Sequence, residues 1–437
     1  MRFQALNRMV RMSALPLGVA RRAGLAGGLK VLGRLTDESA LELHEQTADQ
    51  LFEVLGGLKG GVMKFGQVLS VYEAVLPPSI SDVYRRRLVL LQEAARPESA
   101  EMVHRVMEQD IGPDWQDLFA SFEFDAAAAA SLGQVHRAVW HDGRPVAVKV
   151  QYPDAGEQLL GDRDLLVFAM RWFTSLVAPE LDGRALAGEL MDRIAEELDY
   201  AQEARSQTAF RSGFADDPDF RIPEVVRQDG RVLVSEWIGG TPLAQIISSG
   251  GQAERDRAGL LLTRLMFSGI PRCGLMHGDP HPGNFRLDDD GRLGVLDFGA
   301  VHRHRPGTEP PLQKWMRVHL AEDPEELLRV LRELEFLSPD VRVDAGRLKD
   351  LFDRTGAPVR ADLFKFDAAY LRDTLGGLTD SMSVGLGLAF PPDLVQAQRA
   401  IGVAIAVLCR LEAEIPFRDE GIRWLDPTPP SSSTYVL

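Results

Sequence analysis

The first part of the chain has apolar residues at helical spacing. They recur every three or four positions over residues 41–58 and again over 63–74, after a break at Gly60-Gly61. Pro77 and Pro78 then mark a turn before a further helical stretch at 81–93. The pattern predicts a helical region that extends to about Asp110.

A second region, from about Trp115 to Trp237, mixes short strands with helices. Alternating apolar and polar residues predict the strands, and turn residues such as Asp229-Gly230 join them in pairs. In chain order the predicted elements are strands at 132–140 and 145–150, helices at 155–177 and 185–210, and strands at 225–226 and 231–237. This mixture is typical of an α+β domain.

From Thr241 onward the pattern is helical, with one interruption. Residues 285–287 and 292–296 form a predicted β-hairpin whose acidic turn closes with Gly291. The last residues, 427–437, are rich in proline and serine, which predicts a disordered tail.

Composition narrows the classes of function. The chain has 437 residues, 45% of them hydrophobic, and a net charge of -15, and a chain of this length forms roughly two or three structural units. Phosphates would be repelled by such a surface, which argues against nucleic-acid binding. Only two cysteines, Cys273 and Cys409, occur, which favours a reducing compartment. No stretch reaches the roughly 18 to 20 apolar residues of a membrane-spanning helix.

The segment from Met1 to Thr36 contains basic residues but no acidic ones. It is consistent with an amphipathic helix on a membrane surface, a transit-like peptide or a solvated basic helix. These alternatives stay open.

The strongest chemical signal lies in residues 277–299. HGDPHPGN at 277–284 precedes the predicted hairpin, and DFG follows it at 297–299. A phosphoryl-transfer site needs one oxygen group that accepts a proton or orients the nucleophile, and others that hold magnesium against the phosphates. Asp279 and Asn284 supply the first function and one metal ligand, and the hairpin returns the chain so that Asp297 faces the same metal.

His277 and His281 offer a different interpretation, a zinc-binding pair four residues apart. Pro280 and Pro282 argue against the helix that would bring both imidazoles together. The phosphoryl-transfer interpretation is therefore favoured over zinc.

A second signal is VAVKV at 146–150. In a strand, Ala147 and Lys149 share one face and the valines lie on the other. Alanine leaves room for a flat adenine ring, and the adjacent lysine reaches the phosphates. Lys149 is also the only lysine between Lys64 and Lys314 in a chain that otherwise uses arginine.

Two further segments fit the same interpretation. The alanine-rich loop 126–130, followed by Ser131, stands where a kinase carries its glycine-rich cover over the phosphates. The acidic segment 196–203 is predicted to be helical, and a kinase-like site needs one helix carboxylate, here Glu203, to hold the strand lysine. Taken alone, the first could be a low-complexity helix start and the second a solvated helix face.

Together these residues closely resemble the UbiB/AarF family of atypical protein-kinase-like proteins. The resemblance spans about 58–411 and includes KFGQ at 64–67 (the KxGQ signature), AAAS at 128–131 and ELD at 197–199 (the ExD signature). It implies an α+β, two-lobed protein-kinase-like fold. The implied parts are an N-terminal helical extension at 1–114, a kinase-like N-lobe at 115–239, a mostly helical C-lobe at 240–426 and the tail at 427–437.

The resemblance also implies a role for each site residue. The catalytic residues would be Asp279, Lys149 and Glu203, the last two as an ion pair, and the magnesium ligands would be Asn284 and Asp297. ATP would be bound by Ala128, Ala129, Ala130, Ser131, Ala147 and Lys149, with Glu236 and Trp237 at the hinge beside adenine. On the substrate side, Lys64, Gly66 and Gln67 would face Glu197 and Asp199 and restrain activity.

Three features depart from the family pattern. The loop is entirely alanine where the family tends to begin with proline and a bulky apolar residue, and Ser206 stands where the family usually has asparagine. These departures bear on nucleotide affinity and selectivity. No kinase-type activation segment follows Gly299, which weakens a role in peptide phosphorylation.

The expected function is that of an atypical kinase or ATPase, dependent on ATP and magnesium, that supports isoprenoid quinone biosynthesis or prenyl-lipid homeostasis. Expected partners are the nucleotide, a membrane surface or prenyl lipid, and quinone-biosynthesis proteins, but no nucleic acid. The expected location is the cytoplasm, at the inner face of a bacterial membrane. Two alternatives stay open: a small-molecule phosphotransferase of the aminoglycoside or choline kinase type, and a non-enzymatic, nucleotide-gated lipid-binding scaffold.

Overall fold

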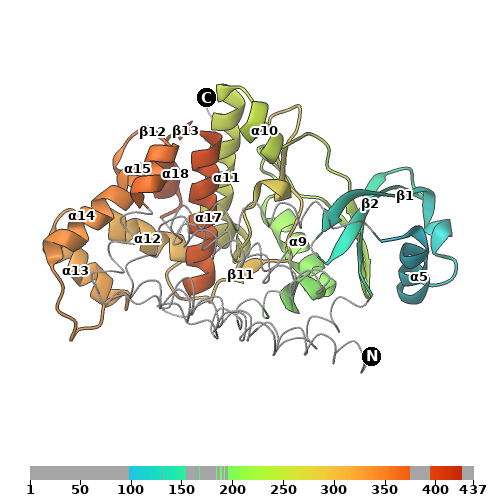
Figure 1. Cartoon of the computed structure of the whole chain (residues 1–437), viewed down its shortest axis with the longest axis horizontal. Helices are drawn as coiled ribbons and strands as arrows, with labels where there is room; N and C mark the ends of the chain where they lie inside the picture. Colours follow the sequence, from blue (N-terminus) through green and yellow to red (C-terminus); the bar gives the residue numbers. More distant parts are fainter. Residues whose placement is uncertain are drawn as a thin grey trace, which may run out of the picture. The chain divides into compact units, whose positions relative to one another are not determined.

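The fold is taken from a computed structural model of the chain (Figure 1). The structure describes residues 98–130, 132–153, 195–374 and 394–425, together with four single positions, Val167, Arg184, Gly188 and Met191. The chain divides into two compact units. The first consists of Met1–Ala138 and Val148–Leu198, and the second of Val139–Ala147 and Asp199–Leu437. The domain boundaries predicted at 114/115 and 239/240 stay predictions.

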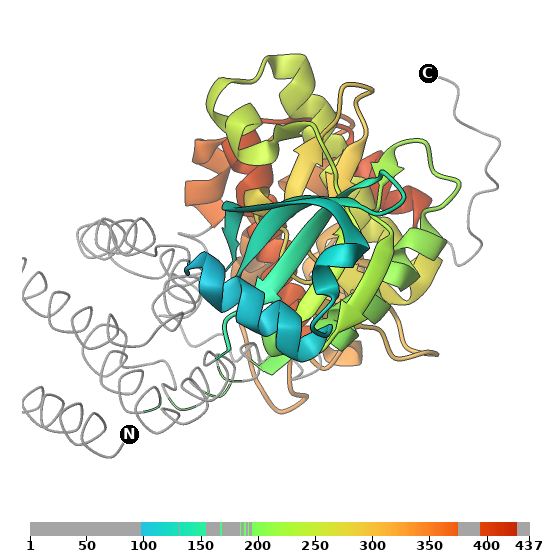
Figure 2. The same cartoon turned by 90° about the vertical axis from the view of Figure 1, so that its right-hand side faces the viewer.

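The first unit contains helix α5 (Ala100–Asp110), which confirms the end of the predicted helical region. Ser99 caps this helix, because its side chain accepts a hydrogen bond from the Met102 amide. The buried face of α5 lies against strand β1 (Phe119–Ala130), as the blue helix in Figure 2 shows. Between them Trp115 is only 1% exposed, and its ring meets Phe119 edge-on.

A five-stranded sheet has the strand order β1-β2-β3-β6-β5. Its other strands are β2 (Gly133–Trp140), β3 (Pro145–Gln151), β6 (Val232–Glu236) and β5 (Val225–Asp229). Both predicted strand pairs are confirmed, and β5 pairs with β6 antiparallel. On β3 the three valines are buried while Ala147 and Lys149 are half-buried, so the predicted alternation of faces is confirmed as well.

Two sequence predictions in this region are wrong. The alanine-rich segment is not a loop, because residues 126–130 are the last part of strand β1. Alanine has a low preference for strands, but main-chain pairing within the sheet outweighs that preference. The predicted helix at 185–210 is not continuous either, because it breaks at Asp199, which caps helix α9 (Tyr200–Gly213).

The second unit is built around helix α11 (Gln252–Cys273), in which every residue from Ala258 to Ile270 except Leu260 is buried. It contacts α9, α17 (Val395–Leu411) and α18 (Phe417–Arg423), and the helices enclose one continuous apolar core. The other helices whose bounds lie within the described residues of this unit are α10 (Leu243–Ser249), α12 (Pro311–Leu320), α13 (Pro324–Glu333), α14 (Ala345–Thr355) and α15 (Ala357–Arg360). This composition confirms the helical pattern predicted after Thr241.

Short strands interrupt the helices of the second unit. A four-stranded sheet has the order β4-β10-β9-β7, and two-stranded pairs join β8 to β11 and β12 to β13. The strands are β4 (Phe220–Arg221), β7 (Thr241–Pro242), β8 (Leu275–His277), β9 (Phe285–Leu287), β10 (Leu293–Val295), β11 (Val301–Arg303), β12 (Phe364–Lys365) and β13 (Glu414–Ile415). The hairpin predicted from the acidic turn is β9–β10.

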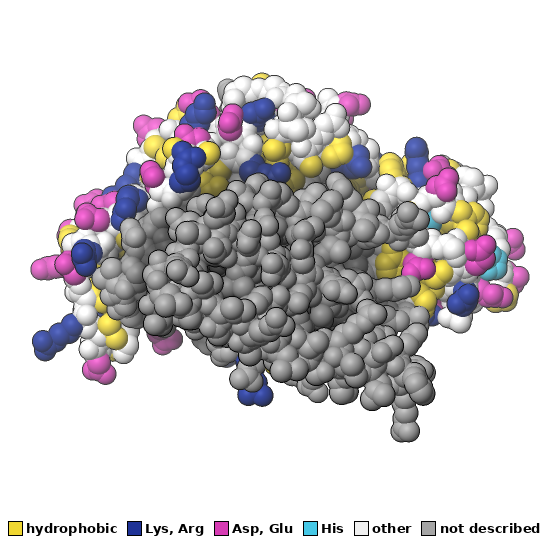
Figure 3. Space-filling view, in the orientation of Figure 1, with side chains coloured by type: hydrophobic (Ala, Val, Ile, Leu, Met, Phe, Trp, Pro, Cys, Tyr) yellow, Lys and Arg dark blue, Asp and Glu magenta, His cyan; other side chains and the backbone are white. Residues whose placement is uncertain are grey.

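The surface of α13 and α14 carries charges of both signs, which lie at the left of Figure 3. On α13, Arg329 forms ion pairs with Glu326 and Glu333 at helical spacing. Exposed pairs of this kind contribute little stability. None of the helices that the structure describes is long and apolar enough to cross a membrane.

Candidate active site

The site is built on the loop that follows strand β8, and His277 at the end of that strand organises it. His277 is 1% exposed. Its Nε2 lies 2.8 Å from the carbonyl oxygen of Asp297, and its Nδ1 lies 3.3 Å from the amide nitrogen of Asp279. An imidazole that donates through Nε2 and accepts through Nδ1 satisfies both contacts. One neutral side chain therefore joins the two segments that carry the aspartates.

Asp279 and Asn284 face each other across a tight loop. Asn284 lies at the end of a short 3-10 turn (Pro282–Asn284), and the His281 side chain caps that turn by accepting from the Gly283 amide. The Nδ2 of Asn284 donates to the carbonyl oxygen of Asp279 at 3.0 Å and to its Oδ2 at 3.3 Å. The five-residue spacing seen in the sequence thus places the two side chains in contact.

The β9–β10 hairpin returns the chain to this loop. Leu296, directly after β10, donates its amide to the carbonyl oxygen of Asn284 at 2.9 Å. Asp297 follows, and its Oδ1 accepts the Gly299 amide at 2.9 Å. At the far end of the hairpin, Asp288 accepts the Arg292 amide and pairs with the Arg292 guanidinium. The acidic turn therefore holds the hairpin, and the hairpin places Asp297 beside Asn284.

Glu203 lies next to the DFG segment. It is 2% exposed on helix α9. A Cβ atom added at Gly299 would lie 3.3 Å from Oδ1 of Asp297 and 3.6 Å from Oε2 of Glu203. The backbone at Gly299 thus lies close to both carboxylates, and glycine leaves the space that they occupy.

Packing of aromatic rings fixes the DFG segment against α9. Phe298 is fully buried, and its ring centroid lies 5.2 Å from that of Phe210 on α9. Phe298 also meets the His277 ring at 6.1 Å, and Phe285 meets it at 5.2 Å. Side chains that are locked in this way hold the polar groups at their ends in one arrangement.

Burial keeps His277 neutral. Loss of solvation lowers the pKa of His277, and the nearby charges of Asp279 and Asp297 oppose this shift only in part. Burial also lowers the pKa of His281, against the opposing effect of Asp279. A neutral His277 retains the lone pair on Nδ1 that accepts the Asp279 amide.

The oxygen groups of this loop fit magnesium. Asp279, Asn284 and Asp297 supply two carboxylates and one carboxamide, and magnesium prefers oxygen ligands. Because Nδ2 of Asn284 donates to Asp279, its Oδ1 is the atom that remains for a cation. The zinc alternative does not fit, because both ring nitrogens of His277 contact main-chain groups. Within the described ranges, no group of three or more His, Cys, Asp or Glu side chains could hold a metal ion.

Other site residues predicted from the sequence lie outside the segment 277–299. Lys149 lies on β3 in the first unit, where Gln151 at the end of the strand donates to the carbonyl oxygens of Glu197 and Leu198. The Asp199 side chain caps α9 by accepting from the Gln202 amide at 2.8 Å. The regulatory roles of Glu197 and Asp199 stay predictions.

The predicted adenine hinge lies in the second unit, at the end of β6. The Glu236 carboxylate pairs with Arg221 at 2.6 Å, and the Trp237 amide donates to the carbonyl oxygen of Pro145 at 3.0 Å. Ala128 is exposed on β1. Lys64, Gly66, Gln67 and Ser131 lie outside the described residues, as do the side chains of Ala129 and Ala130.

Sequence reasoning missed two residues that support the site. His277 was weighed only as a zinc ligand, and its bridging role depends on burial and on contacts that the sequence alone does not indicate. Arg399, on helix α17, donates to the carbonyl oxygen of Gly278 at 3.5 Å. No local motif marks Arg399, since it lies far along the chain.

The class of protein follows from three features. They are the five-stranded sheet, the buried Glu203 on helix α9, and the loop and hairpin that carry Asp279, Asn284 and Asp297. Together they are typical of a protein-kinase-like fold. Residues 90–331 match the family model described as the ABC1 atypical kinase-like domain. The chain therefore belongs to the ABC1 (UbiB/AarF) family of atypical kinases.

Two proteins that are similar in sequence to this chain are named as kinases. The chain is 30% identical over 391 residues to the rat protein named atypical kinase COQ8B, mitochondrial, covering 86% of this chain and 71% of that protein. It is 36% identical over 269 residues to the Arabidopsis thaliana protein named activity of bc1 complex kinase 1, chloroplastic, covering 58% of this chain and 38% of that protein. A solved structure of the Mycobacterium tuberculosis protein Rv3197 in complex with erythromycin is similar with a TM-score of 0.65 and 37% identity, covering 90% of this chain and all of that one.

Proposed function

We propose that the chain is an ATP- and magnesium-dependent atypical kinase or ATPase that supports isoprenoid quinone biosynthesis or prenyl-lipid homeostasis. The observation that carries the proposal is the hydrogen-bonded contact of Asp279 with Asn284, on a loop that His277 joins to Asp297. Family membership agrees with it, since the domain that matches is described as an atypical kinase-like domain.

Each polar group of the loop has a proposed task in phosphoryl transfer. Asp279 accepts a proton from the attacking hydroxyl or water, or orients it. Asn284 and Asp297 hold magnesium, which when bound neutralises phosphate charge. His277, neutral and buried, keeps the Asp279 and Asp297 segments together. These tasks need only the side chains that the loop and hairpin already bring together.

The remaining roles follow from the family resemblance. Lys149 contacts the phosphates and pairs with Glu203. The backbone of residues 128–131 covers the nucleotide, and Ala147, Glu236 and Trp237 adjoin the adenine. Lys64, Gly66 and Gln67, together with Glu197 and Asp199, restrain access to the substrate side.

The proposed setting is a membrane surface. The basic segment from Met1 to Thr36 is attracted to anionic lipid headgroups by its charge. Proposed partners are a prenyl lipid and proteins of quinone biosynthesis. The protein is proposed to act from the cytoplasmic face of a bacterial membrane.

The test is ATP turnover by the purified full chain, with and without magnesium and with and without anionic liposomes. Asp297→Asn removes the charge of a proposed metal ligand, so turnover should fall at least about 100-fold. Asp290→Asn is the matched control, because Asp290 is on the same hairpin and its side chain is 73% exposed. Turnover in that variant should stay at the level of the unchanged protein.

Three other outcomes would redirect the assignment. Equal turnover by Asp297→Asn would reject the catalytic role of this loop. Transfer of phosphate to a soluble alcohol with a one-to-one yield would favour the small-molecule phosphotransferase. Nucleotide binding that raises thermal stability without any release of phosphate would favour the non-enzymatic scaffold.

A further inference from the structure

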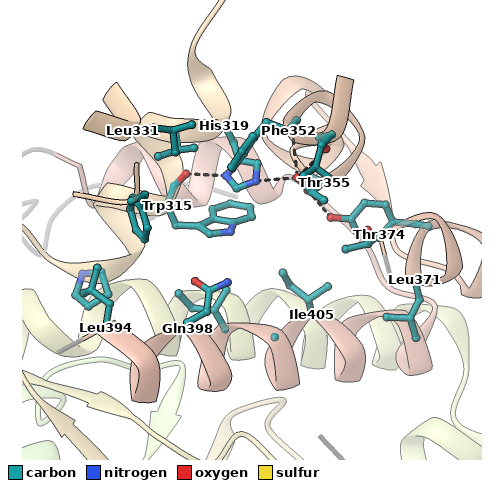
Figure 4. A pocket seen from close by; sticks show the side chains of 17 residues that line it. Trp315, His319, Leu331, Phe352, Thr355, Leu371, Thr374, Leu394, Gln398 and Ile405 are labelled. Carbon is teal, nitrogen blue, oxygen red and sulfur yellow. Dashed lines mark hydrogen bonds between the residues drawn. The ribbon is translucent and has the colours of Figure 1, made fainter. Parts of the chain in front are cut away.

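The second unit contains a cavity that takes no part in the proposed phosphoryl-transfer site. Its volume is about 180 Å³, and helices α12, α13, α14 and α17 contribute to its wall. Figure 4 shows Gln398 and Ile405 on α17, with Trp315, His319 and Thr355 across the cavity from them. None of the residues 277–299 lines it.

The part of the cavity wall that the structure describes is uncharged. Among the described residues that line it there is no aspartate, glutamate, lysine or arginine. Of the two titratable rings, Tyr370 stays neutral because burial raises the pKa of its phenol. His319 has its pKa lowered to about 4, first by burial and then by the charge of Arg360, against the opposing effects of the Trp315 carbonyl and Asp353. A charged ligand would find no counter-ion here, so an ion would lose its hydration without compensation.

The wall is rigid on the side of α12 and α14. His319 is 4% exposed, and its Nδ1 lies 2.8 Å from the Trp315 carbonyl oxygen. Its Nε2 lies 3.0 Å from the Thr355 hydroxyl, and the Tyr370 hydroxyl donates to the Thr355 carbonyl oxygen at 2.7 Å. The His319 ring also stacks near Trp315, with the centroids 4.1 Å apart. These bonds pair the His319 ring and the hydroxyl groups of Thr355 and Tyr370.

Two polar groups of the wall are not paired in this way. The Thr374 hydroxyl is buried and has no hydrogen-bond partner among the described residues. The Gln398 amide extends from α17 toward the cavity (Figure 4), and no hydrogen bond joins it to any residue that the structure describes. An amide beside apolar side chains such as Ile401 and Ile405 gains stability when a partner pairs with it. Carboxamides both donate and accept, so a hydroxyl or a carbonyl group would suffice.

The volume limits the size of a ligand. An apolar cavity of about 150 Å³ is large enough for benzene, and this one is somewhat larger at about 180 Å³. Space for it continues at Gly402 on α17, where an added Cβ would have no heavy atom within 4 Å. Gly402 lines the cavity and is itself exposed, so the cavity is open at this residue.

We propose that this cavity binds an uncharged, largely hydrocarbon molecule of roughly seven to ten non-hydrogen atoms, with one hydroxyl or carbonyl group against the Gln398 amide. The site is distinct from the one for nucleotide and magnesium. Its occupation does not depend on whether the chain turns over ATP.

The test measures binding of three ring probes to the full chain by ligand-detected NMR. Benzyl alcohol carries a hydroxyl, toluene is the hydrocarbon alone, and benzoate adds a negative charge to the same ring. Benzyl alcohol should bind at least about tenfold more tightly than benzoate and a few-fold more tightly than toluene. Equal binding of benzoate, or no binding of benzyl alcohol, would overturn the proposal.

Two variants locate the probe in the cavity. Gly402→Leu fills the open space, so benzyl alcohol should bind at least about tenfold more weakly, while the matched change Gly402→Ala should alter binding less than about threefold. Gln398→Leu should remove the preference for benzyl alcohol over toluene. Unchanged affinity in Gly402→Leu would contradict the location.

A measurement on the unaltered protein covers the case in which Gly402→Leu does not fold. Crystals soaked with 4-bromobenzyl alcohol should show the bromine among Trp315, Phe352 and Ile405, with the hydroxyl at Gln398. A soaked crystal without bromine density in the cavity would overturn the proposal.

Discussion

The loop at 277–299 and the cavity beside α17 use the same fold in opposite ways. The loop collects polar groups from one contiguous stretch. It joins them through His277, whose two hydrogen bonds to the main chain are 2.8 and 3.3 Å long. The cavity is lined by residues of several helices, most of them apolar, and leaves the Gln398 amide and the Thr374 hydroxyl without a described partner. Chemistry that needs charges at fixed distances is encoded locally, whereas a recess for an apolar molecule arises from helices that do not fill the space between them.

Gly278 in the loop and Gly402 at the cavity differ in the space around them in the same way. At Gly278 an added Cβ would lie 2.9 Å from the carbonyl oxygen of Ala300, which is main chain. At Gly402 the added atom would meet nothing within 4 Å. The first glycine is required by close approach of two backbone segments, and the second is exposed where the cavity is open.

The largest expected effect is a loss of ATP turnover when the loop at 277–299 is changed. Asp279→Asn removes the group that accepts a proton, so ATP turnover should fall by about 10² to 10⁴-fold. Steady-state turnover with saturating magnesium measures it.

The matched variant on the apolar side is Gly402→Leu, which should leave turnover within about twofold because the cavity shares no residue with the loop. A loss of turnover that is similar in both variants would break the distinction between the two regions.

Much of the polar region was predictable from the sequence. Period-two alternation gave β3 with Ala147 and Lys149 on one face, and the acidic turn gave the β9–β10 hairpin. The order of Asp279, Asn284 and Asp297 along the chain predicts that they lie close together, because a short loop and a short hairpin permit few arrangements. The Asp279–Asn284 hydrogen bond agrees with that prediction.

The rest could not be predicted, because it depends on distant partners. The alanines at 126–130 joined a strand because the sheet supplied main-chain pairing, which no local preference of alanine indicates. The break at Asp199 arises where an acidic side chain caps the next helix turn, although the same residues also fit an uninterrupted helix. The cavity depends on how four helices pack, and Arg399 reaches Gly278 across more than a hundred residues.

The next prediction tests the acid sensitivity of the cavity wall. His319 has a pKa of about 4 in the folded protein, against the ordinary histidine value of 6.5 in the unfolded chain, so the unfolded chain binds more protons between these two pH values. Folding stability should therefore fall as the pH drops from about 6.5 to about 4, by about 3 kcal/mol from this residue. Urea unfolding at a series of pH values measures the loss.

His319→Phe keeps a ring beside Trp315 but cannot titrate. The pH dependence of this variant should be flatter by the contribution of one proton, while the slope from His277, whose pKa is also lowered, remains. If the free energy of unfolding changes with pH equally in the unaltered protein and in His319→Phe, the pKa of His319 does not differ between the folded and unfolded states.

Smaller changes in stability are expected when Gly278 and Gly402 are each replaced by alanine. Gly278→Ala should destabilise the protein by about 1 to 3 kcal/mol, because the new methyl group meets the main chain at Ala300. Gly402→Ala should stabilise it by up to about 1 kcal/mol, because alanine favours the helix and the space is open. Urea midpoints at neutral pH measure both changes. A destabilising Gly402→Ala would show that the space beside α17 is already filled.

The smallest effect is expected at Gln398. Gln398→Leu loses no hydrogen bond to a described residue and adds an apolar side chain to an apolar wall, so stability should change by less than about 1 kcal/mol. Gln207→Leu is the matched contrast, because Gln207 is 1% exposed and donates to the Pro223 carbonyl oxygen at 2.8 Å. That variant leaves a buried acceptor unpaired and should cost about 1 to 3 kcal/mol. Equal costs in urea unfolding would mean that the Gln398 amide has a partner in the folded protein, and the cavity would then lack the polar group that the proposed ligand needs.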